Sequence, residues 1–288
     1  MNNISNLKEK VLIVIPIINN YKIFKDSFYN KNNLENRKSE TISLVRALNV
    51  NVLDVLTIKI NKFSSAYLFN KNSLDCILEL IQKFKINLLI IDFQLSPIQQ
   101  RNLELLFKVK VIDRTQVILE IFSSRAISNE GKIQVELAAL NFQKTRLVRS
   151  WTHLERQRGG SGFLGGPGER QIELDRRIIN KNIKNLNASL QKVVKTRSIQ
   201  NSKRKNSSSI IVSLVGYTNT GKSTLFNNLT NSSVISKNML FATLDPTLRL
   251  MKHEMSYKNK IILSDTVGFI SSLPTELVES FKSTLEFI

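Results

Sequence analysis

The spacing of glycine, lysine and serine between residues 216 and 224 is the part of this sequence best suited to chemistry. The segment reads Gly-Tyr-Thr-Asn-Thr-Gly-Lys-Ser-Thr and follows an apolar run from Ile210 to Val215 that predicts a buried strand. In a G-x-x-x-x-G-K-[ST] loop, glycines let backbone N–H groups turn toward a phosphate, the lysine reaches the β- and γ-phosphates, and the hydroxyl ligates Mg²⁺. The helical spacing that follows adds the donors of a helix N-terminus. We therefore predict a nucleotide phosphate site formed by Gly216, Tyr217, Thr218, Asn219, Thr220, Gly221, Lys222, Ser223 and Thr224.

Two later segments narrow the prediction from a nucleotide site to a GTPase. Phe-Ala-Thr-Leu-Asp-Pro-Thr, residues 241–247, lies where a GTPase places the switch that reaches over the γ-phosphate, and Thr243 is the expected Mg²⁺ ligand beside Ser223. An apolar strand from Ile261 then ends in D-x-x-G, so Asp265 can hold the Mg²⁺ shell and the Gly268 N–H can sense the γ-phosphate. The predicted GTP contacts in these segments are Phe241, Ala242, Thr243, Leu244, Asp265, Thr266, Val267 and Gly268.

The residue after the D-x-x-G pattern is Phe269, where Ras-type enzymes carry a glutamine that orients the attacking water. A phenylalanine side chain cannot accept or donate a hydrogen bond, so we expect slow intrinsic hydrolysis that depends on a partner or an ion. The carbonyl oxygen of Asn219 could help to hold a monovalent cation such as K⁺ near the β/γ bridge. The alternative, an asparagine satisfied by the loop backbone, is equally open. No residue is assigned as catalytic.

Composition favours an intracellular protein with a polyanionic partner. The 42 lysines and arginines outnumber the 23 acidic residues, for a net charge of +19. A single cysteine, Cys76, excludes a disulfide framework and fits a reducing compartment. The apolar run from Val11 to Ile18 is too short for a membrane span. We expect a cytoplasmic, monomeric protein.

Positive charge concentrates between residues 130 and 205, which hold 17 lysines and arginines against 6 acidic residues. Apolar residues there repeat at helical spacing in two runs, with the Gly-rich segment 159–168 between them, where we expect no helix. The runs are Ile133, Leu137, Leu140, Leu147, Trp151 and Leu154, then Ile172, Ile179, Ile183, Leu186, Leu190 and Val193. This predicts an antiparallel helical hairpin with basic outer faces. A charged helix face is usually only solvated surface, but one-signed charge near the tip favours RNA backbone contacts. The RNA-binding candidates are Arg146, Arg149, Arg156, Arg158, Arg170, Arg176 and Arg177.

Ahead of the hairpin, apolar strands alternate with helical stretches, which predicts a small α/β domain with a parallel sheet. The expected strands are 11–18, 50–60 and 87–92, and the expected helices are 39–48, 73–84 and 97–107. The segments 21–37 and 199–209 read as a loop and a hinge. The predicted fold class is α/β, with an N-terminal α/β domain at 1–113, a basic helical hairpin at 114–205 and an incomplete P-loop GTPase domain at 206–288.

These segments together resemble the HflX family of ribosome-associated GTPases, over most of residues 86–288. The resemblance is carried by Ser96-Pro97, Gln100–Glu104, Val111–Thr115, Glu130–Ala138, Thr145–Leu147, Gly166–Glu169 and the GYTNTGKSTLFN, FATLDPT and DTVGF segments. It implies GTP and GDP as ligands with Mg²⁺, and an N-terminal domain and hairpin that engage the large ribosomal subunit and its rRNA. Family members can separate stalled ribosomes into subunits.

The sequence also departs from that family. The chain has Asn70-Lys71-Asn72-Ser73 where the family pattern has Gly-x-Gly-Lys, and Gly165 and Arg170 stand where Arg and Thr are usual. A GTPase domain needs roughly 160 residues, whereas only 80 follow from Ser209, and no Asn-Lys-x-Asp guanine-reading segment follows the loop. An amphipathic helix is expected from Pro274 to Ile288. Three hypotheses remain open: a ribosome-directed GTPase, a non-catalytic ribosome-binding remnant, and a different P-loop enzyme such as an ATPase.

Overall fold

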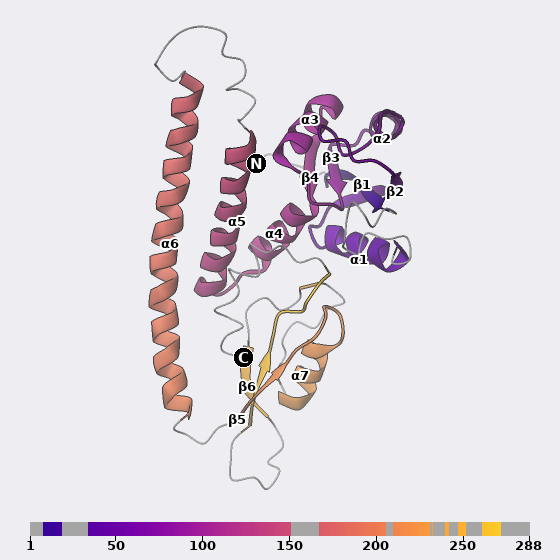
Figure 1. Ribbon diagram of the computed structural model, residues 1–288. Coiled ribbons are helices and arrows are strands. Elements are labelled where there is room, and N and C mark those ends of the chain that lie inside the picture. The colour runs from indigo at the N-terminus through magenta and orange to yellow at the C-terminus, as the bar shows by residue number, and fades with distance from the viewer. Residues whose placement is uncertain are drawn as a thin grey trace, which may run out of the picture. The chain divides into compact units, whose positions relative to one another are not determined.

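The computed structural model describes residues 8–18, 34–150, 167–205, 210–230, 232, 240–241, 247–251 and 261–271, apart from the side chains of 148–150, 167–172, 197–198 and 200–205. The chain divides into two compact units, residues 1–121 and 122–288. The first unit is built on a parallel sheet and the second contains two long helices and a smaller sheet (Figure 1). Helix α4 crosses the division between the units.

The first unit is a four-stranded parallel sheet with the strand order β2-β1-β3-β4. Its elements are β1 (Lys10–Ile18), α1 (Leu34–Arg46), β2 (Asn51–Ile60), α2 (Lys71–Phe84), β3 (Leu88–Ile91), α3 (Pro97–Phe107), β4 (Lys110–Asp113) and α4 (Arg114–Arg125). From β1 the chain adds β2 on one side of the sheet and then β3 and β4 on the other side. Open α/β sheets commonly bind ligands where the order of strands changes side in this way, here between β1 and β3. The predicted α/β fold class is confirmed.

Burial explains why the strands of this unit read as continuous apolar runs. Residues 11–15 of β1 are fully buried, because helices cover both faces of a parallel sheet. Leu12 and Val14 pack into one core with residues of α2 and α3. Helix α3 begins where predicted because Ser96, directly before Pro97, forms a capping box with Gln99.

One local prediction in this unit is corrected. Helix α1 begins at Leu34, so the end of the segment predicted as a loop at 21–37 is helical. The missed signal is the helical spacing of Arg37, Thr41, Leu44 and Val45, all buried, with an arginine at a core position. Asn70, which stands where the family pattern has glycine, has φ −80° and caps α2 by accepting a hydrogen bond from the Ser73 N–H at 2.9 Å.

The predicted hairpin is formed by α5 (Asn129–Ser150) and α6 (Pro167–Lys205), and the shorter α5 lies beside part of α6 in Figure 1. The predicted seam residues Ile179, Ile183 and Leu186 are half-buried on α6, between exposed neighbours. Helix α6 differs from the prediction at both ends. It includes Pro167 and Gly168, because proline is compatible with a first helical position, and it continues through the expected hinge to Lys205, a stretch without glycine or proline.

The nucleotide-binding motifs lie in a three-stranded sheet with the order β5-β7-β6. Its elements are β5 (Ile210–Leu214), α7 (Lys222–Thr230), β6 (Thr247–Leu250) and β7 (Ile261–Asp265). Strand β7 pairs in parallel with β5 and antiparallel with β6. The helix expected at 274–288 lies outside the described residues. Among the helices of the described ranges, none has the length and hydrophobicity to cross a membrane.

Candidate nucleotide-binding site

Parallel pairing of β5 and β7 brings the two nucleotide-binding motifs to one edge of the sheet. The register places Leu214 opposite Asp265, so the loop that follows β5 and the D-x-x-G turn that follows β7 leave the sheet side by side. The Thr266 hydroxyl connects the end of β7 to the end of β5 by donating a hydrogen bond to the Leu214 carbonyl oxygen at 2.7 Å. Carboxyl ends of adjacent parallel strands are the usual ligand-binding edge of such sheets. The structure therefore joins motifs that lie about 50 residues apart in the sequence.

The two predicted Mg²⁺-shell residues that the structure describes are in direct contact. The Ser223 hydroxyl donates to the Asp265 Oδ2 at 2.7 Å, and Asp265 is fully buried. A carboxylate and a hydroxyl are hard oxygen ligands of the kind Mg²⁺ prefers, usually together with waters and substrate phosphates. No cluster of three or more His, Cys, Asp or Glu side chains suited to a metal occurs in the described ranges. The donor set therefore fits a metal that is completed by a nucleotide.

Lys222 is folded back onto its own loop. Its ammonium group donates to the Tyr217 carbonyl oxygen at 2.5 Å, and the Thr220 hydroxyl donates to the same oxygen at 2.8 Å. Burial lowers the pKa of Lys222 below its ordinary value, while the negative charge of Asp265 acts in the opposite direction. A partly desolvated ammonium group has much to gain from a phosphate, so this geometry is suited to anion capture.

Glycine is required at two positions. One is in the P-loop, residues 216–224, because of its backbone conformation, and the other is in the D-x-x-G turn, because that turn lies close to the P-loop. Gly221 has φ +85°, a left-handed conformation that costs glycine little. Gly268 of the D-x-x-G turn lies against the P-loop: a Cβ atom there would meet the Thr218 Cα at 2.7 Å. The Thr218 N–H donates to the Phe269 carbonyl oxygen at 2.8 Å, and the Phe269 N–H donates to the Gly216 carbonyl oxygen at 3.0 Å. These two hydrogen bonds attach the two loops directly to each other.

Asn219 is exposed and has φ +61°. In the part of the chain that the structure describes, its side chain makes no hydrogen bond, so the loop backbone does not satisfy it there. Phe269 is 40% exposed and contributes only its backbone to the contact between the loops. The predicted contacts Ala242, Thr243 and Leu244 lie outside the described residues, while Phe241 is buried.

The RNA-binding candidates have different surroundings. Arg176 and Arg177 are exposed on α6, where Arg177 pairs with Glu173 one turn earlier. Arg146 is half-buried, with its guanidinium group 4.2 Å from the centre of the Phe142 ring. The side chains of the remaining candidates lie outside the described residues, namely Arg149, Arg156, Arg158 and Arg170.

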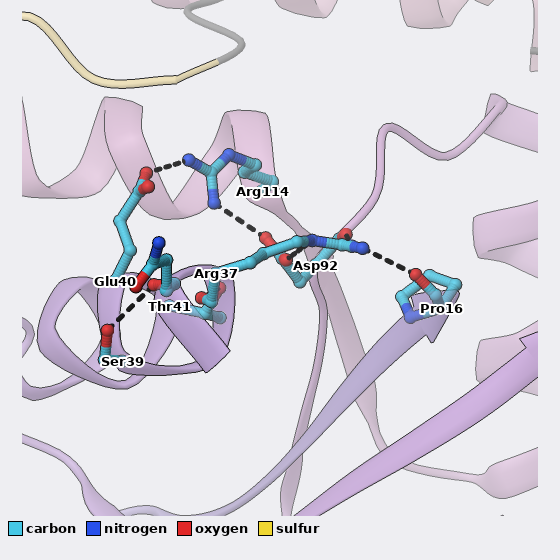
Figure 2. Close-up of polar contacts among 8 residues, drawn as sticks. Pro16, Arg37, Ser39, Glu40, Thr41, Asp92 and Arg114 are labelled. Carbon is cyan, nitrogen blue, oxygen red and sulfur yellow. Dashed lines mark hydrogen bonds and ion pairs between the residues drawn. The ribbon is translucent and has the colours of Figure 1, made fainter. Parts of the chain in front are cut away.

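A second concentration of charge, which the sequence did not predict, lies at the carboxyl edge of the first sheet (Figure 2). Asp92, directly after β3, is fully buried and accepts hydrogen bonds from Arg37 Nε at 2.6 Å and Arg114 Nη1 at 2.8 Å. Arg37 also donates to the Pro16 carbonyl oxygen at 2.6 Å, and Arg114 also pairs with Glu40. Burial raises the pKa of Asp92, but the two arginines outweigh burial and hold the pKa below its ordinary value.

Three protein-family models match separate parts of the chain. Residues 35–123 match a model described as the N-terminal region of a GTP-binding GTPase, and residues 125–204 match its middle region. Residues 211–287 match a model described as a 50S ribosome-binding GTPase. Together these matches cover both units of the chain.

Curated relatives extend the same similarity. A protein of Magnetococcus marinus named GTPase HflX is 49% identical over 245 residues, which are 85% of this chain and 56% of that protein. The Escherichia coli protein of the same name is 46% identical over 244 residues, or 85% and 57% of the two chains. A solved structure described as the complex of SsGBP and GDP has a TM-score of 0.51 and 25% identity, and covers 97% of this chain and 68% of the other. The chain thus spans a little over half the length of these curated relatives.

Proposed function

Because the chain belongs to the HflX family of GTPases, we propose that it binds GTP and GDP with Mg²⁺ and hydrolyses GTP in association with the large ribosomal subunit. The observation that carries the proposal is the contact between the P-loop and the D-x-x-G turn. That contact places Ser223, Asp265 and Lys222 at one sheet edge, with Gly268 against the loop. These are the groups that GTPases direct at the β- and γ-phosphates and at Mg²⁺.

Each residue has a defined task in this proposal. Lys222 leaves the Tyr217 carbonyl oxygen for phosphate oxygens, which offer a charge-assisted hydrogen bond instead of a neutral one. Ser223 and Asp265 would hold Mg²⁺, whose positive charge neutralises the phosphates, with Thr243 as a further ligand. The Gly268 N–H would donate to the γ-phosphate, because two backbone hydrogen bonds hold its turn against the P-loop.

Hydrolysis needs help that the described residues do not supply. Phe269 cannot orient a water molecule through its side chain. Asn219, exposed in the P-loop, is the residue we propose to share a K⁺ ion with the β/γ-phosphate bridge. GTP hydrolysis that is unchanged when K⁺ replaces Na⁺ would remove this part of the proposal.

The proposed second partner is ribosomal RNA. The exposed basic residues of α6, including Arg176, Arg177, Lys181 and Lys184, and the net charge of +19 support contacts to a phosphate backbone. We propose that the chain acts as a monomer on the large subunit in the cytoplasm and takes part in splitting or rescuing stalled ribosomes. Such binding should weaken steeply with salt, because phosphate contacts release counterions.

A non-catalytic ribosome-binding remnant is the second candidate function. It is favoured by the exposed basic residues of α6, which can bind RNA whether or not a nucleotide is turned over. On this hypothesis residues 1–205 bind RNA and nucleotide turnover is negligible.

Calorimetry with GTP, GDP and ATP in the presence of Mg²⁺ tests the proposal on the 288-residue chain. We expect guanine-selective binding that Lys222→Ala weakens by about 2–5 kcal/mol, because the variant removes the charged phosphate ligand. The matched control is Lys71→Ala, an exposed lysine of α2, which should not change binding. Equal binding of ATP and GTP would favour the general P-loop enzyme. No nucleotide binding, together with salt-sensitive cosedimentation with ribosomes, would favour the remnant.

A further inference from the structure

Phe241 has an unusual backbone conformation for a large residue. It is the first residue of the predicted switch segment and has φ +56°, in the left-handed region that bulky residues rarely adopt. Its side chain is only 2% exposed. Conformations of this kind persist where the surroundings hold them, and they gather at functional sites and switch regions. The packing around Phe241 therefore holds this residue in its left-handed conformation.

The ring that contacts Phe241 belongs to the last turn of α4. Phe122 is 1% exposed, and its ring centre lies 4.6 Å from that of Phe241 with an interplanar angle of 89°. Edge-to-face geometry is the arrangement that aromatic quadrupoles favour. Both residues belong to the unit formed by residues 122–288. Phe122 stands at the start of that unit, just ahead of α5, and lies 119 residues before Phe241 in the sequence.

We propose that Phe122 is a positioning residue for the nucleotide switch. Its ring holds Phe241 in the left-handed conformation and so fixes the backbone from which the chain continues to Thr243, two residues later. The proposal rests on the proposed GTP-dependent function, in which Thr243 is an Mg²⁺ ligand. It adds a residue outside the P-loop and the switch segments, in a helix that leads directly into the hairpin.

A positioning contact of this kind couples two places in both directions. If GTP draws the switch segment toward the γ-phosphate, the position of Phe241 against Phe122 must respond. By linkage, a partner that shifts the last turn of α4 or the start of α5 then changes the affinity for GTP relative to GDP by the same factor. The contact gives the hairpin a direct physical connection to the nucleotide state.

Amide hydrogen exchange on the nucleotide-free chain tests the positioning role itself. Phe122→Leu keeps an apolar side chain but removes the ring, and exchange of a peptide covering residues 240–251 should become about three- to tenfold faster. Phe142→Leu is the matched control, because Phe142 is a buried phenylalanine of the same unit whose ring lies under Arg146. It should leave exchange of that peptide unchanged. No change with Phe122→Leu, or an equal change with Phe142→Leu, would overturn the proposal.

Nucleotide affinity tests the coupling. Fluorescent GTP and GDP analogues should show that Phe122→Leu lowers GTP affinity about three- to tenfold more than GDP affinity. Adding Phe122→Leu to Phe241→Leu should cause little further loss, because both remove the same contact. Equal losses for the two nucleotides would overturn the coupling. If the unmodified chain binds neither nucleotide, the proposed function fails, and the exchange experiment still decides whether Phe122 positions the segment.

Discussion

Each of the two sheets carries a buried aspartate at the carboxyl end of an inner strand, but the two carboxylates have different partners. Asp92, after β3, is enclosed by the guanidinium groups of Arg37 and Arg114. Asp265, at the end of β7, accepts a hydrogen bond from the Ser223 hydroxyl, and its negative charge acts to raise the pKa of the nearby Lys222. The positions in the sheets are equivalent, but Asp92 pairs with two guanidinium groups, whereas Asp265 is hydrogen-bonded to an uncharged hydroxyl.

The difference shows how a protein can use one sheet edge for stability and another for ligand binding. Around Asp92 the positive charges come from the protein itself, and α1 and α4 deliver them in fixed, hydrogen-bonded positions (Figure 2). Asp265 instead accepts a hydrogen bond from the Ser223 hydroxyl, and the nearby Lys222 donates to a loop carbonyl oxygen. A metal and a phosphate can replace those weaker partners, whereas no ligand can readily replace two buried arginines.

The largest expected effect comes from removing the Asp92 charge. Asp92→Asn removes the buried carboxylate that pairs with both Arg37 and Arg114, and should cost about 3–5 kcal/mol of folding free energy. Asp265→Asn keeps an acceptor for the Ser223 hydroxyl and should cost about 1 kcal/mol, but it should abolish Mg²⁺-dependent nucleotide binding. Urea unfolding followed by circular dichroism measures both costs. Equal destabilisation by the two variants would contradict the division into a structural and a binding edge.

A smaller effect is expected where the D-x-x-G turn contacts the P-loop. Gly268→Ala places a methyl group 2.7 Å from the Thr218 Cα, so the two loops must separate, at a cost of about 1–3 kcal/mol. Gly216→Ala is the stability control, because its Cβ would meet the Thr220 hydroxyl oxygen at 3.5 Å and the Lys222 Cδ at 3.9 Å, which are ordinary van der Waals contacts. The midpoint of thermal unfolding should fall more for Gly268→Ala. A larger fall for Gly216→Ala would show that the loops are not in close contact in solution.

The smallest expected effect is the acid sensitivity of the first sheet. Because the folded-state pKa of Asp92 lies below its unfolded value, its contribution to stability is fully present above about pH 4 and is lost as the pH falls toward the folded pKa. The urea midpoint should therefore drop as the pH falls below about 4 in the unmodified chain. Asp92→Asn should show a shallower dependence on pH, since position 92 no longer titrates. Identical slopes would exclude Asp92 as a source of acid sensitivity.

Sequence patterns predicted the elements that have strong local signals. Helix α3 matched its prediction at both ends because its capping residues and its proline act within one turn. Strands β1 and β2 differed by one residue at their starts, since continuous apolar runs mark buried strands well. Arg37 was assigned to a loop because an arginine at a core position hides the apolar face of a helix. Its role becomes visible only with Asp92, 55 residues away.

The candidate site shows the same division. The sequence by itself determined that a strand, a loop and a helix follow one another around residues 216–224 and that D-x-x-G follows a strand. It also predicted a phosphate site there, because glycine, lysine and hydroxyl spacing are local requirements of phosphate binding. Only the tertiary structure decided that Gly268 touches Thr218, that Ser223 bonds to Asp265, and that Phe122 meets Phe241. These contacts join residues 42 to 119 positions apart, where strand pairing and helix packing, rather than local spacing, set which side chains meet.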